Sequence, residues 1–177
     1  MRLFIAINFP EEIRDALWQE SMGLREFAEQ GSFSRKENLH LTLAFLGEVQ
    51  PKRIKEIREI MDRLPKVPIT LELSGFGAFS GRREQLYWRG AARDQALIDC
   101  RTTLCDMLRA AGFGLDAKPF KPHITMARRC VMTPDFSMET FRRQLQTLRF
   151  PVPGISLMRS EHIGGKLVYT EMYKVIL

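Results

Sequence analysis

The stretch "KPHITMARR", Lys121–Arg129, contains a His-x-Thr pattern that occurs a second time in "NLHLTLAF", Asn38–Phe45. The chain contains three histidines, and two of them, His40 and His123, begin this pattern. In both stretches polar and apolar residues alternate, which is typical of a β-strand with one face in the core. The repeat therefore predicts two similar strands, one in each half of the chain.

The elements around the two motifs are predicted from apolar spacing and from the positions of proline and glycine. The first half is predicted to contain a strand at 2–9, a helix that starts at Pro10 and is stopped by Gly31, the motif strand at 40–47, a helix from Pro51 to Pro65, and strands at 68–79 and 85–90 joined by a polar loop at 80–85. The second half is predicted to contain a helix through Leu97 and Ala111, the motif strand at 122–128, a helix at 138–148 capped by Ser137, and strands at 155–163 and 167–177 that meet at Gly164 and Gly165. Both halves share the order helix, motif strand, helix, strand, strand. We therefore expect an α+β fold, a duplication of two similar lobes within a single domain, 1–177.

The composition is that of a globular protein. The chain has 177 residues, of which 45% are hydrophobic and 27% charged, which excludes a disordered or fibrous protein and allows a substantial core. Lys and Arg together number 27 against 21 Asp and Glu, which gives a net charge of +6. This excess favours acidic ligands such as phosphates or nucleic acid.

The cysteines and the hydrophobic segments bear on the cellular location. Cys100, Cys105 and Cys130 are an odd number without CxxC spacing, so neither a disulfide framework nor a zinc knuckle is indicated. The N-terminal apolar run is too short for a signal peptide, and no segment approaches the roughly 20 apolar residues of a membrane span. No apolar stripe argues for a dimer. We expect a cytoplasmic monomer without a membrane segment.

The motif places chemically active groups on one face of each strand. Side chains two positions apart point the same way, so His40 and Thr42 share a face, as do His123 and Thr125. If a pseudo-twofold axis relates the halves, both strands can face one groove, with two imidazoles and two hydroxyls around a small anion. In-line displacement at a phosphodiester needs a base on the attacking oxygen and an acid on the leaving oxygen. Two histidines supply both near neutral pH, and the hydroxyls can bind phosphate oxygens, so the pattern requires no metal and no cofactor.

Two alternatives explain the same residues without this chemistry. Threonine favours strands, so both pairs can be purely structural. Threonine occupies only nine of 177 positions, however, which makes two chance matches among three histidines uncommon. A zinc site is the second alternative, but neither motif carries an acidic or Cys ligand at characteristic spacing.

Several residues near the motifs are weighed separately. His162 stands beside a predicted turn without a Thr partner and is expected to be a solvated loop histidine outside the site. Strand alternation places Arg129, and not Arg128, on the His123 face unless the strand ends or bulges there. Phe45 is kept as a candidate substrate contact, although such aromatic residues more often belong to the core. The other basic and aromatic residues considered are expected to be ordinary rim or core residues: Arg35, Lys36, Lys118, Lys121, Tyr87 and Trp88.

The motifs "HLTLAFLGEV" and "KPHITMAR" together resemble the two-histidine (2H) phosphoesterase superfamily. More narrowly, the chain is similar to the bacterial and archaeal RNA 2′,3′-cyclic phosphodiesterases, also named RNA 2′,5′-ligases. The resemblance extends over almost the entire chain, from "RLFIAINFP" to "LVYTEMYKVIL". It implies a bilobal fold with pseudo-twofold symmetry, in which two antiparallel β-sheets are flanked by helices and the active groove lies between the lobes.

The resemblance also implies a role for each site residue. His40 would be the proton donor and His123 the proton acceptor. Thr42 and Thr125 would bind the phosphate, and Arg128 would contact it as well, in contrast to the choice made by strict alternation. The implied substrate is an RNA end bearing a 2′,3′-cyclic phosphate, which is hydrolysed to a 2′-phosphomonoester, with 2′,5′ ligation as a minor related activity.

Two other functions stay open. One keeps the groove but changes the substrate to 2′,5′-linked oligoadenylate or a small cyclic nucleotide. The other is a non-catalytic module that binds RNA ends. Phosphate binding alone is better served by arginine than by paired imidazoles, whose particular advantage is proton transfer, so the sequence favours an enzyme.

Overall fold

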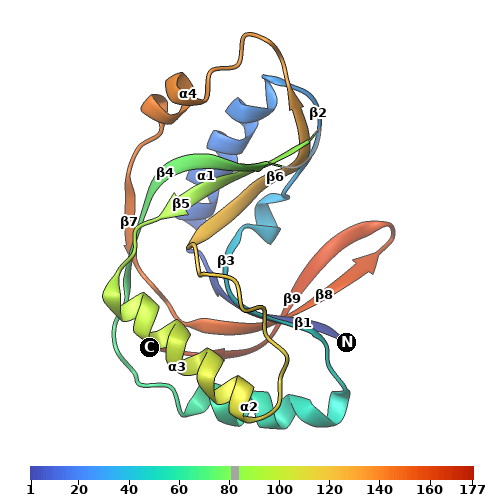
Figure 1. Cartoon of the computed structure of the whole chain (residues 1–177), viewed down its shortest axis with the longest axis vertical. Coiled ribbons are helices and arrows are strands. Elements are labelled where there is room, and N and C mark those ends of the chain that lie inside the picture. Colours follow the sequence, from blue (N-terminus) through green and yellow to red (C-terminus); the bar gives the residue numbers. More distant parts are fainter. Residues whose placement is uncertain (81–83) are drawn as a thin grey trace.

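The computed structural model describes residues 1–80 and 84–177, and within them the chain forms nine strands, four α-helices and two short 3₁₀ helices (Figure 1). Residues 81–83, part of the predicted loop at 80–85, lie outside the described residues. In chain order the elements are β1 (Arg2–Asn8), α1 (Glu11–Arg25), β2 (Ala28–Phe33), η1 (Lys36–Asn38), β3 (His40–Glu48), η2 (Pro51–Arg53), α2 (Ile54–Asp62), β4 (Thr70–Ser80), β5 (Gln85–Ala91), α3 (Gln95–Ala110), β6 (His123–Met132), α4 (Met138–Gln144), β7 (Leu148–Pro151), β8 (Ile155–Ile163) and β9 (Lys166–Val175). Both predicted motif strands are present, as β3 and β6.

The strands form two antiparallel sheets with the orders β3-β1-β8-β9 and β2-β6-β5-β4-β7. We call them the β3 sheet and the β6 sheet, because each contains one motif strand. The hairpin that follows each motif strand pairs in the other sheet: β4 and β5 join the β6 sheet, whereas β8 and β9 join the β3 sheet. The predicted α+β class with two antiparallel sheets is confirmed, but each sheet takes strands from both halves of the sequence.

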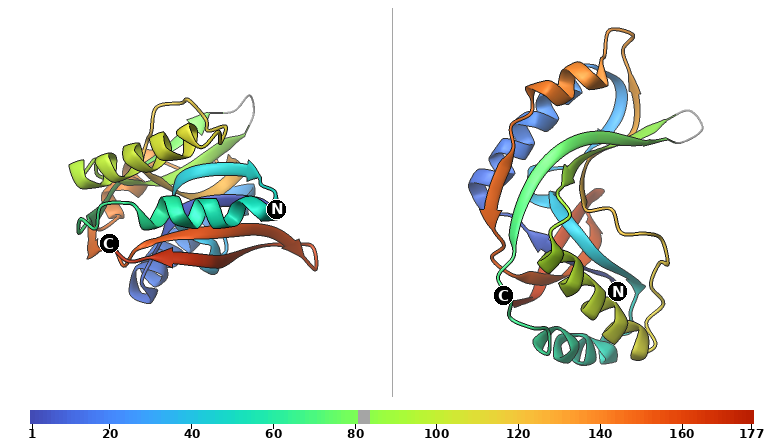
Figure 2. Two further views of the ribbon diagram at one scale, coloured as in Figure 1. Left: turned by 90° about the horizontal axis from the view of Figure 1, so that it is seen from below. Right: turned by 60° about the vertical axis from the view of Figure 1, so that its left-hand side comes forward.

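The helices cover one face of each sheet. Helices α2 and α3 lie together against the β3 sheet, at the lower end of the molecule in Figure 1, and α1 and α4 pack on the β6 sheet. Figure 2 shows the strong curvature of β4, which lets the two sheets turn toward each other. The faces that the helices leave uncovered carry the two motif histidines and line a common cleft.

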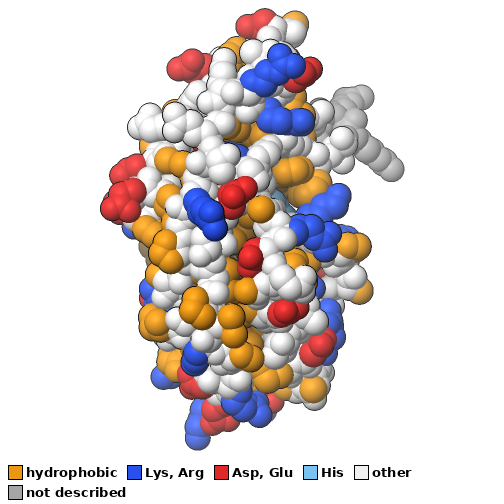
Figure 3. Space-filling view, turned by 90° about the vertical axis from the view of Figure 1, so that its left-hand side faces the viewer, with side chains coloured by type: hydrophobic (Ala, Val, Ile, Leu, Met, Phe, Trp, Pro, Cys, Tyr) orange, Lys and Arg blue, Asp and Glu red, His pale blue; other side chains and the backbone are white. Residues whose placement is uncertain are grey.

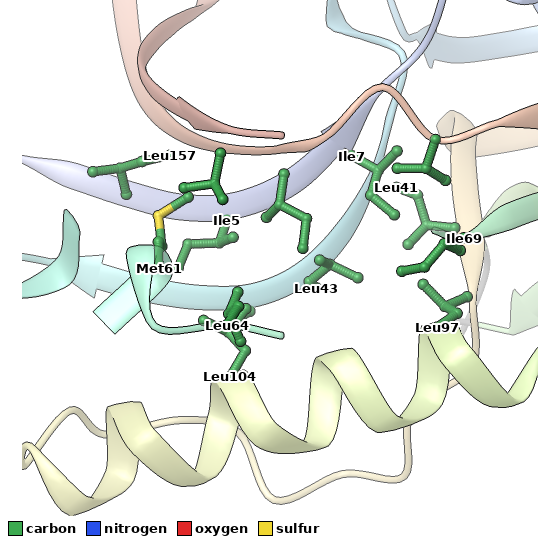
Figure 4. Packing of buried hydrophobic residues seen from close by; sticks show 14 of the residues in the cluster. Ile5, Ile7, Leu41, Leu43, Met61, Leu64, Ile69, Leu97, Leu104 and Leu157 are labelled. Atoms are coloured by element: carbon green, nitrogen blue, oxygen red, sulfur yellow. The ribbon is translucent and has the colours of Figure 1, made fainter. Parts of the chain in front are cut away.

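The alternation predicted for the motif strands is found in the core. Leu41 and Leu43 of β3 are 0% and 3% exposed and pack in a cluster with Leu104 of α3 (Figure 4). Ile124 and Met126 of β6 are fully buried in the same way. Burying a side chain of this size stabilises the fold by about 1.5–3 kcal/mol, so the apolar face fixes the orientation of each motif strand. The His and Thr side chains are therefore held on the opposite face.

One predicted helix is too long. The helix that starts at Pro10 was expected to continue to residue 30, but α1 ends at Arg25 and the chain then forms β2. The spacing suggested a helix because Phe27 follows Leu24 by three residues, yet the Phe27 ring instead packs on Phe136 with centroids 5.6 Å apart. Strand β2 is an exposed, polar edge strand, and its pairing with the distant β6 leaves no local pattern in the sequence.

The helix predicted at 138–148 is also too long. It begins as expected, since the Ser137 hydroxyl accepts a hydrogen bond from the backbone N–H of Thr140 at 3.3 Å. It ends at Gln144, however, and Leu148 begins β7, which pairs with β4 at the edge of the β6 sheet. Of the apolar residues expected on one helix face, Phe141 lies in α4, Leu145 follows the end of the helix and Leu148 lies in β7.

The surface offers little by itself to suggest a function. Within residues 1–80 and 84–177, each helix is too short or too polar to cross a lipid bilayer. The face shown in Figure 3 mixes basic and acidic side chains with hydrophobic and uncharged ones. The functional groups are found in the clefts instead.

Candidate active site

A cleft of about 480 Å³ lies between the two sheets. Strands β1, β3, β8 and β9 contribute to one wall, and β2 and β6 contribute to the other. All six side chains that the sequence singled out for the site line this cleft: His40, Thr42, Phe45, His123, Thr125 and Arg128. Residues far apart in the sequence are thus brought together around one volume that can hold a nucleotide-sized ligand.

The two histidines are held in the same way. The Nδ1 atom of His40 lies 2.7 Å from the carbonyl oxygen of Asn38, and Nδ1 of His123 lies 2.7 Å from the carbonyl oxygen of Lys121. A carbonyl only accepts, so in both rings Nδ1 carries the hydrogen and Nε2 is left for chemistry. Nε2 of His40 lies 3.0 Å from the Thr42 hydroxyl. This tautomer suits both a general base and, after protonation, a general acid.

The surroundings of His40 disfavour its charged form. Its ring packs against Phe4 and Tyr169, with centroids 4.8 and 5.2 Å away. Burial lowers the pKa of His40 to about 4, the hydrogen bond to the Asn38 carbonyl opposes this shift, and the nearby Arg128 adds to it. In the unliganded protein, His40 is therefore neutral at pH 7.

A β-bulge brings Phe45 to the cleft. Strict alternation would place Phe45 on the core face, together with Leu41 and Leu43. The pairing of β3 with β1 shifts register at this point, so Leu43 and Ala44 are both buried and the pattern restarts one residue later. Phe45 is 45% exposed and lines the cleft, with the Arg2 guanidinium 5.0 Å from its ring centroid.

The second motif strand contains the corresponding irregularity. The pairing of β6 with β5 shifts register so that Met126 and Ala127 are both buried. As a result Arg128, and not Arg129, lines the cleft, and the alternation argument for Arg129 was wrong. The Arg128 Nη2 donates to the Thr125 hydroxyl at 3.4 Å.

Some cleft residues were not found by sequence reasoning. Tyr169 and Leu167 of β9 reach the cleft from the last strand, and the Asn38 side chain donates to the Leu167 carbonyl at 2.9 Å. His162 was expected to lie outside the site; it is exposed near the β8–β9 turn, as predicted, but it also lines the cleft. The last strand was predicted, but nothing local indicated that β9 would join the β3 sheet.

The other basic and aromatic candidates divide between the clefts and the rest of the molecule. Three of the four basic candidates form surface ion pairs: Arg35 with Glu37, Lys36 with Glu11 and Asp15, and Lys118 with Asp116. Arg35 nevertheless lines the cleft. Tyr87 is a core residue, 4% exposed, as expected. Lys121 and Trp88 line a second cleft on the other side of His123.

Two antiparallel sheets that present paired His-x-Thr strands to one cleft define the class of two-histidine phosphoesterases. The sequence profile described as "2'-5' RNA ligase superfamily" matches residues 11–164, and the chain belongs to this superfamily.

Individual relatives agree with this assignment. An RNA 2',3'-cyclic phosphodiesterase of Thermus thermophilus is 33% identical over 100% of this chain and 90% of its own length. An RNA 2',3'-cyclic phosphodiesterase of Geobacillus stearothermophilus is 32% identical over 89% of this chain, but the chain spans only about half of it, 51%. The crystal structure of E. coli LigT complexed with 3'-AMP has 27% identity and a TM-score of 0.80, covering 99% of this chain and 97% of that one.

Proposed function

We propose that this protein is an RNA 2′,3′-cyclic phosphodiesterase that opens a terminal 2′,3′-cyclic phosphate to a 2′-phosphomonoester. The observation that carries the proposal is the matched pair of imidazoles: His40 and His123 have the same tautomer-fixing hydrogen bond and line one cleft. The curated relatives named for this activity support the choice of substrate.

The proposed reaction is a displacement at phosphorus. Water attacks the phosphorus and gives a proton to Nε2 of His123, while the bond from phosphorus to the ribose 3′ oxygen breaks. Nε2 of protonated His40 gives its proton to that oxygen, and the phosphate remains on the 2′ oxygen. Each proton transfer of this kind contributes a factor of ~10²–10⁴ to the rate. The choice of the 3′ oxygen as leaving group is taken from the resemblance to the family.

The phosphate would be held by hydroxyls and one guanidinium. Thr42 and Thr125 can donate to its oxygens, and Arg128 can neutralise charge that develops in the transition state. The same anion would favour the protonated form of His40, whose pKa of about 4 otherwise keeps it neutral. Substrate binding would in this way prepare the proton donor.

The wider setting follows from the same proposal. The partner is an RNA end, and the basic residues Arg2, Arg35 and Lys166 on the cleft wall suit its phosphates. Replacement of water by an RNA 5′-hydroxyl would form a 2′,5′ linkage, which we expect to be the minor activity because water is far more abundant. The chain is proposed to act as a monomeric, single-domain, cytoplasmic enzyme that needs neither metal nor cofactor.

Hydrolysis of an RNA oligonucleotide with a 2′,3′-cyclic phosphate end tests the proposal directly. The assay contains EDTA, identifies the product isomer, and compares the wild type with His40→Ala and His123→Ala. Formation of the 2′-phosphate by the wild type, reduced ~10²-fold or more in both variants, is expected. His162→Ala is the matched comparison, since it removes a cleft histidine without a Thr partner and should cost much less.

Other outcomes would point to other functions. Turnover of 2′,5′-oligoadenylate or of small cyclic nucleotides, without turnover of the RNA end, would change the substrate. Tight binding of the RNA end without turnover, unchanged in His40→Ala, would indicate a binding module. Loss of activity with EDTA would contradict the metal-independent mechanism.

A further inference from the structure

A second cleft, of about 510 Å³, adjoins the candidate active site. His123 lines both clefts and therefore forms part of the wall between them. The second cleft is lined by the aromatic side chains of Phe79, Trp88 and Phe120 and by the buried Phe76. None of the residues singled out for catalysis, other than His123, belongs to it.

Two of these aromatic side chains, Trp88 and Phe79, lie side by side. Trp88 lies across Gly77 of the neighbouring strand, so closely that a Cβ atom on Gly77 would be 2.5 Å from the indole ring. Phe79 lies beside it, with ring centroids 5.4 Å apart. Both rings also meet His123 edge-on, at 5.2 Å from Phe79 and 6.4 Å from Trp88. The Phe79 and Trp88 rings are tilted by 37° to each other, and neighbouring aromatic rings of this kind are what RNA bases stack on.

The cleft is also basic. Arg93, Lys121 and Arg142 line it, and its lining contains no Asp or Glu among the described residues. The Lys121 ammonium lies 5.8 Å from the centroid of the Phe79 ring, so charge and aromatic surface are adjacent. Aromatic rings next to cations are the combination by which proteins bind single-stranded nucleic acid, with the base on the ring and the phosphate near the cation.

We propose that the second cleft binds the nucleotide on the 5′ side of the terminal one, so that the enzyme recognises at least two nucleotides of its RNA. This inference rests on the proposed function. The first cleft contains both histidines, Phe45, Tyr169 and room for the terminal nucleotide itself. Among the described residues, His123 is the only one that lines both clefts. A ligand in the second cleft therefore lies next to the terminal nucleotide, in the place of the adjacent nucleotide of the RNA.

Two substrates separate this role from a contribution to the catalytic centre. One is a nucleoside 2′,3′-cyclic phosphate, and the other is a dinucleotide with the same cyclic end. Arg142→Ala and Phe120→Leu alter the second cleft at residues that, within the described part of the chain, form neither a hydrogen bond nor an aromatic ring pair with His123. Both variants should lose about tenfold in kcat/KM for the dinucleotide and stay within about twofold for the mononucleotide, since only the dinucleotide reaches the second cleft.

Arg143→Ala is the matched control for Arg142→Ala. Arg143 is the next residue of α4, is 77% exposed, pairs with Glu139 and does not line the cleft. It should leave both substrates unaffected. An equal loss on both substrates in Arg142→Ala and Phe120→Leu, or no loss on either, would overturn the proposal. A loss confined to ligation of a 5′-hydroxyl RNA would also overturn it, because the cleft would then hold the attacking strand.

A binding measurement separates this inference from the proposed activity. The chain has two tryptophans, Trp18 and Trp88, so a Trp18→Phe variant reports on the second cleft alone. A dinucleotide 2′-phosphate should quench Trp88 fluorescence more strongly than a mononucleotide 2′-phosphate, and Arg142→Ala should weaken this quenching. Quenching without hydrolysis would support the cleft while refuting the proposed function. Hydrolysis without a difference in quenching between the two ligands would refute the cleft alone.

Discussion

Phe45 and Arg128 occupy equivalent positions in the two motif strands, each five residues after its histidine and each turned into the cleft by a register shift. In both strands two consecutive residues are buried before this position, so the side chain points to the face opposite the one that alternation predicts. One half of the cleft thereby receives an aromatic ring and the other half a guanidinium. The pseudo-twofold site is symmetric in its histidines and threonines but asymmetric in this pair.

Replacement of Arg128 should therefore be far more harmful than replacement of Arg129. Arg128→Ala removes the guanidinium proposed to contact the phosphate, and we expect kcat/KM to fall by ~10², as for loss of a charged hydrogen bond in a site of this kind. Arg129→Ala is the control, since that side chain does not line the cleft, and it should stay within about twofold. Comparable losses in the two variants would contradict the assignment of the bulge.

Arg129 also offers a test of the backbone conformation. Among the described residues it is the only non-glycine residue with a positive φ, 52°. A side chain in this left-handed region costs about 1–2 kcal/mol relative to glycine. Arg129→Gly should therefore raise the free energy of unfolding by about 1 kcal/mol in urea titrations, with Arg129→Ala giving no gain. Destabilisation by the glycine would indicate a different conformation at this residue.

The threonine hydroxyls should matter less than the imidazoles. Thr42→Val and Thr125→Val keep the shape and strand preference of the side chain but remove the hydroxyl proposed to donate to the phosphate. A hydrogen bond to a charged group contributes about 1.5–3 kcal/mol, so kcat should fall by ~10–100-fold. Thr170→Val, on the exposed face of β9 and away from the cleft, is the matched control and should leave kcat unchanged. A loss as large as that of His40→Ala would give the hydroxyls a more direct role.

The titration of His40 should depend on the bound anion. Burial holds the pKa of its imidazole at about 4, against an ordinary value of 6.5. A nucleoside 2′-phosphate in the cleft favours the imidazolium, so the pKa of His40 should rise on binding. At a pH between the pKa of the free protein and that of the complex, binding should therefore take up a proton. Histidine ring NMR, with the signal assigned by His40→Gln, measures both states.

The same titration distinguishes the contribution of Arg128. Its positive charge lowers the pKa of His40, so Arg128→Ala should raise that pKa in the free protein, whereas Arg129→Ala should not change it. A pKa of 6.5 or above for His40 in the unliganded wild type would refute the description of its surroundings. A fall of the pKa on anion binding would refute the role as proton donor.

A buried ion pair holds the β6 sheet to α1. Arg89 is 1% exposed and donates to the Glu20 carboxylate at 2.9 Å, to the Gly75 carbonyl at 2.8 Å and to the Gln146 carbonyl. Arg89→Met leaves these acceptors without a donor and should cost about 3–5 kcal/mol of unfolding free energy. Glu20→Gln keeps an acceptor for the guanidinium and should cost less.

The stability of Arg89→Met should depend on pH with a definite sign. Burial raises the pKa of Glu20, and removal of the Arg89 charge would raise it further. A carboxyl group whose pKa is higher in the folded than in the unfolded state destabilises the folded protein at high pH, where the group is charged. This destabilisation disappears at low pH, where the group is protonated in both states. The deficit of Arg89→Met relative to wild type should therefore shrink as the pH falls from 7 toward 5, as measured by urea unfolding. A deficit that grows over this range would show that Glu20 is not the group left unpaired.

Much of the site could be predicted because it depends on the sequence and spacing of neighbouring residues. The alternation of apolar and polar residues around His40 and His123 determined which face of each strand enters the core, and the buried Leu41 and Ile124 agree with it. The repeated order of elements indicated two related halves, and the resemblance of both motifs to one family indicated phosphodiester chemistry. The strand faces and the two related halves need only neighbouring residues and their spacing, whereas the family assignment rests on the resemblance.

Only the tertiary structure decided which residues complete the cleft. Register shifts in strand pairing turned Phe45 and Arg128 inward, and the exchange of hairpins between the sheets brought Tyr169 of β9 beside His40. Strands β2 and β7 were missed because they are short and are defined by pairing with β6 and β4, which lie far away in sequence. A strand's side-chain pattern is set along the chain, whereas its hydrogen-bonding partner and register are set by the competition between all strands for pairing and burial, which no local stretch of sequence contains.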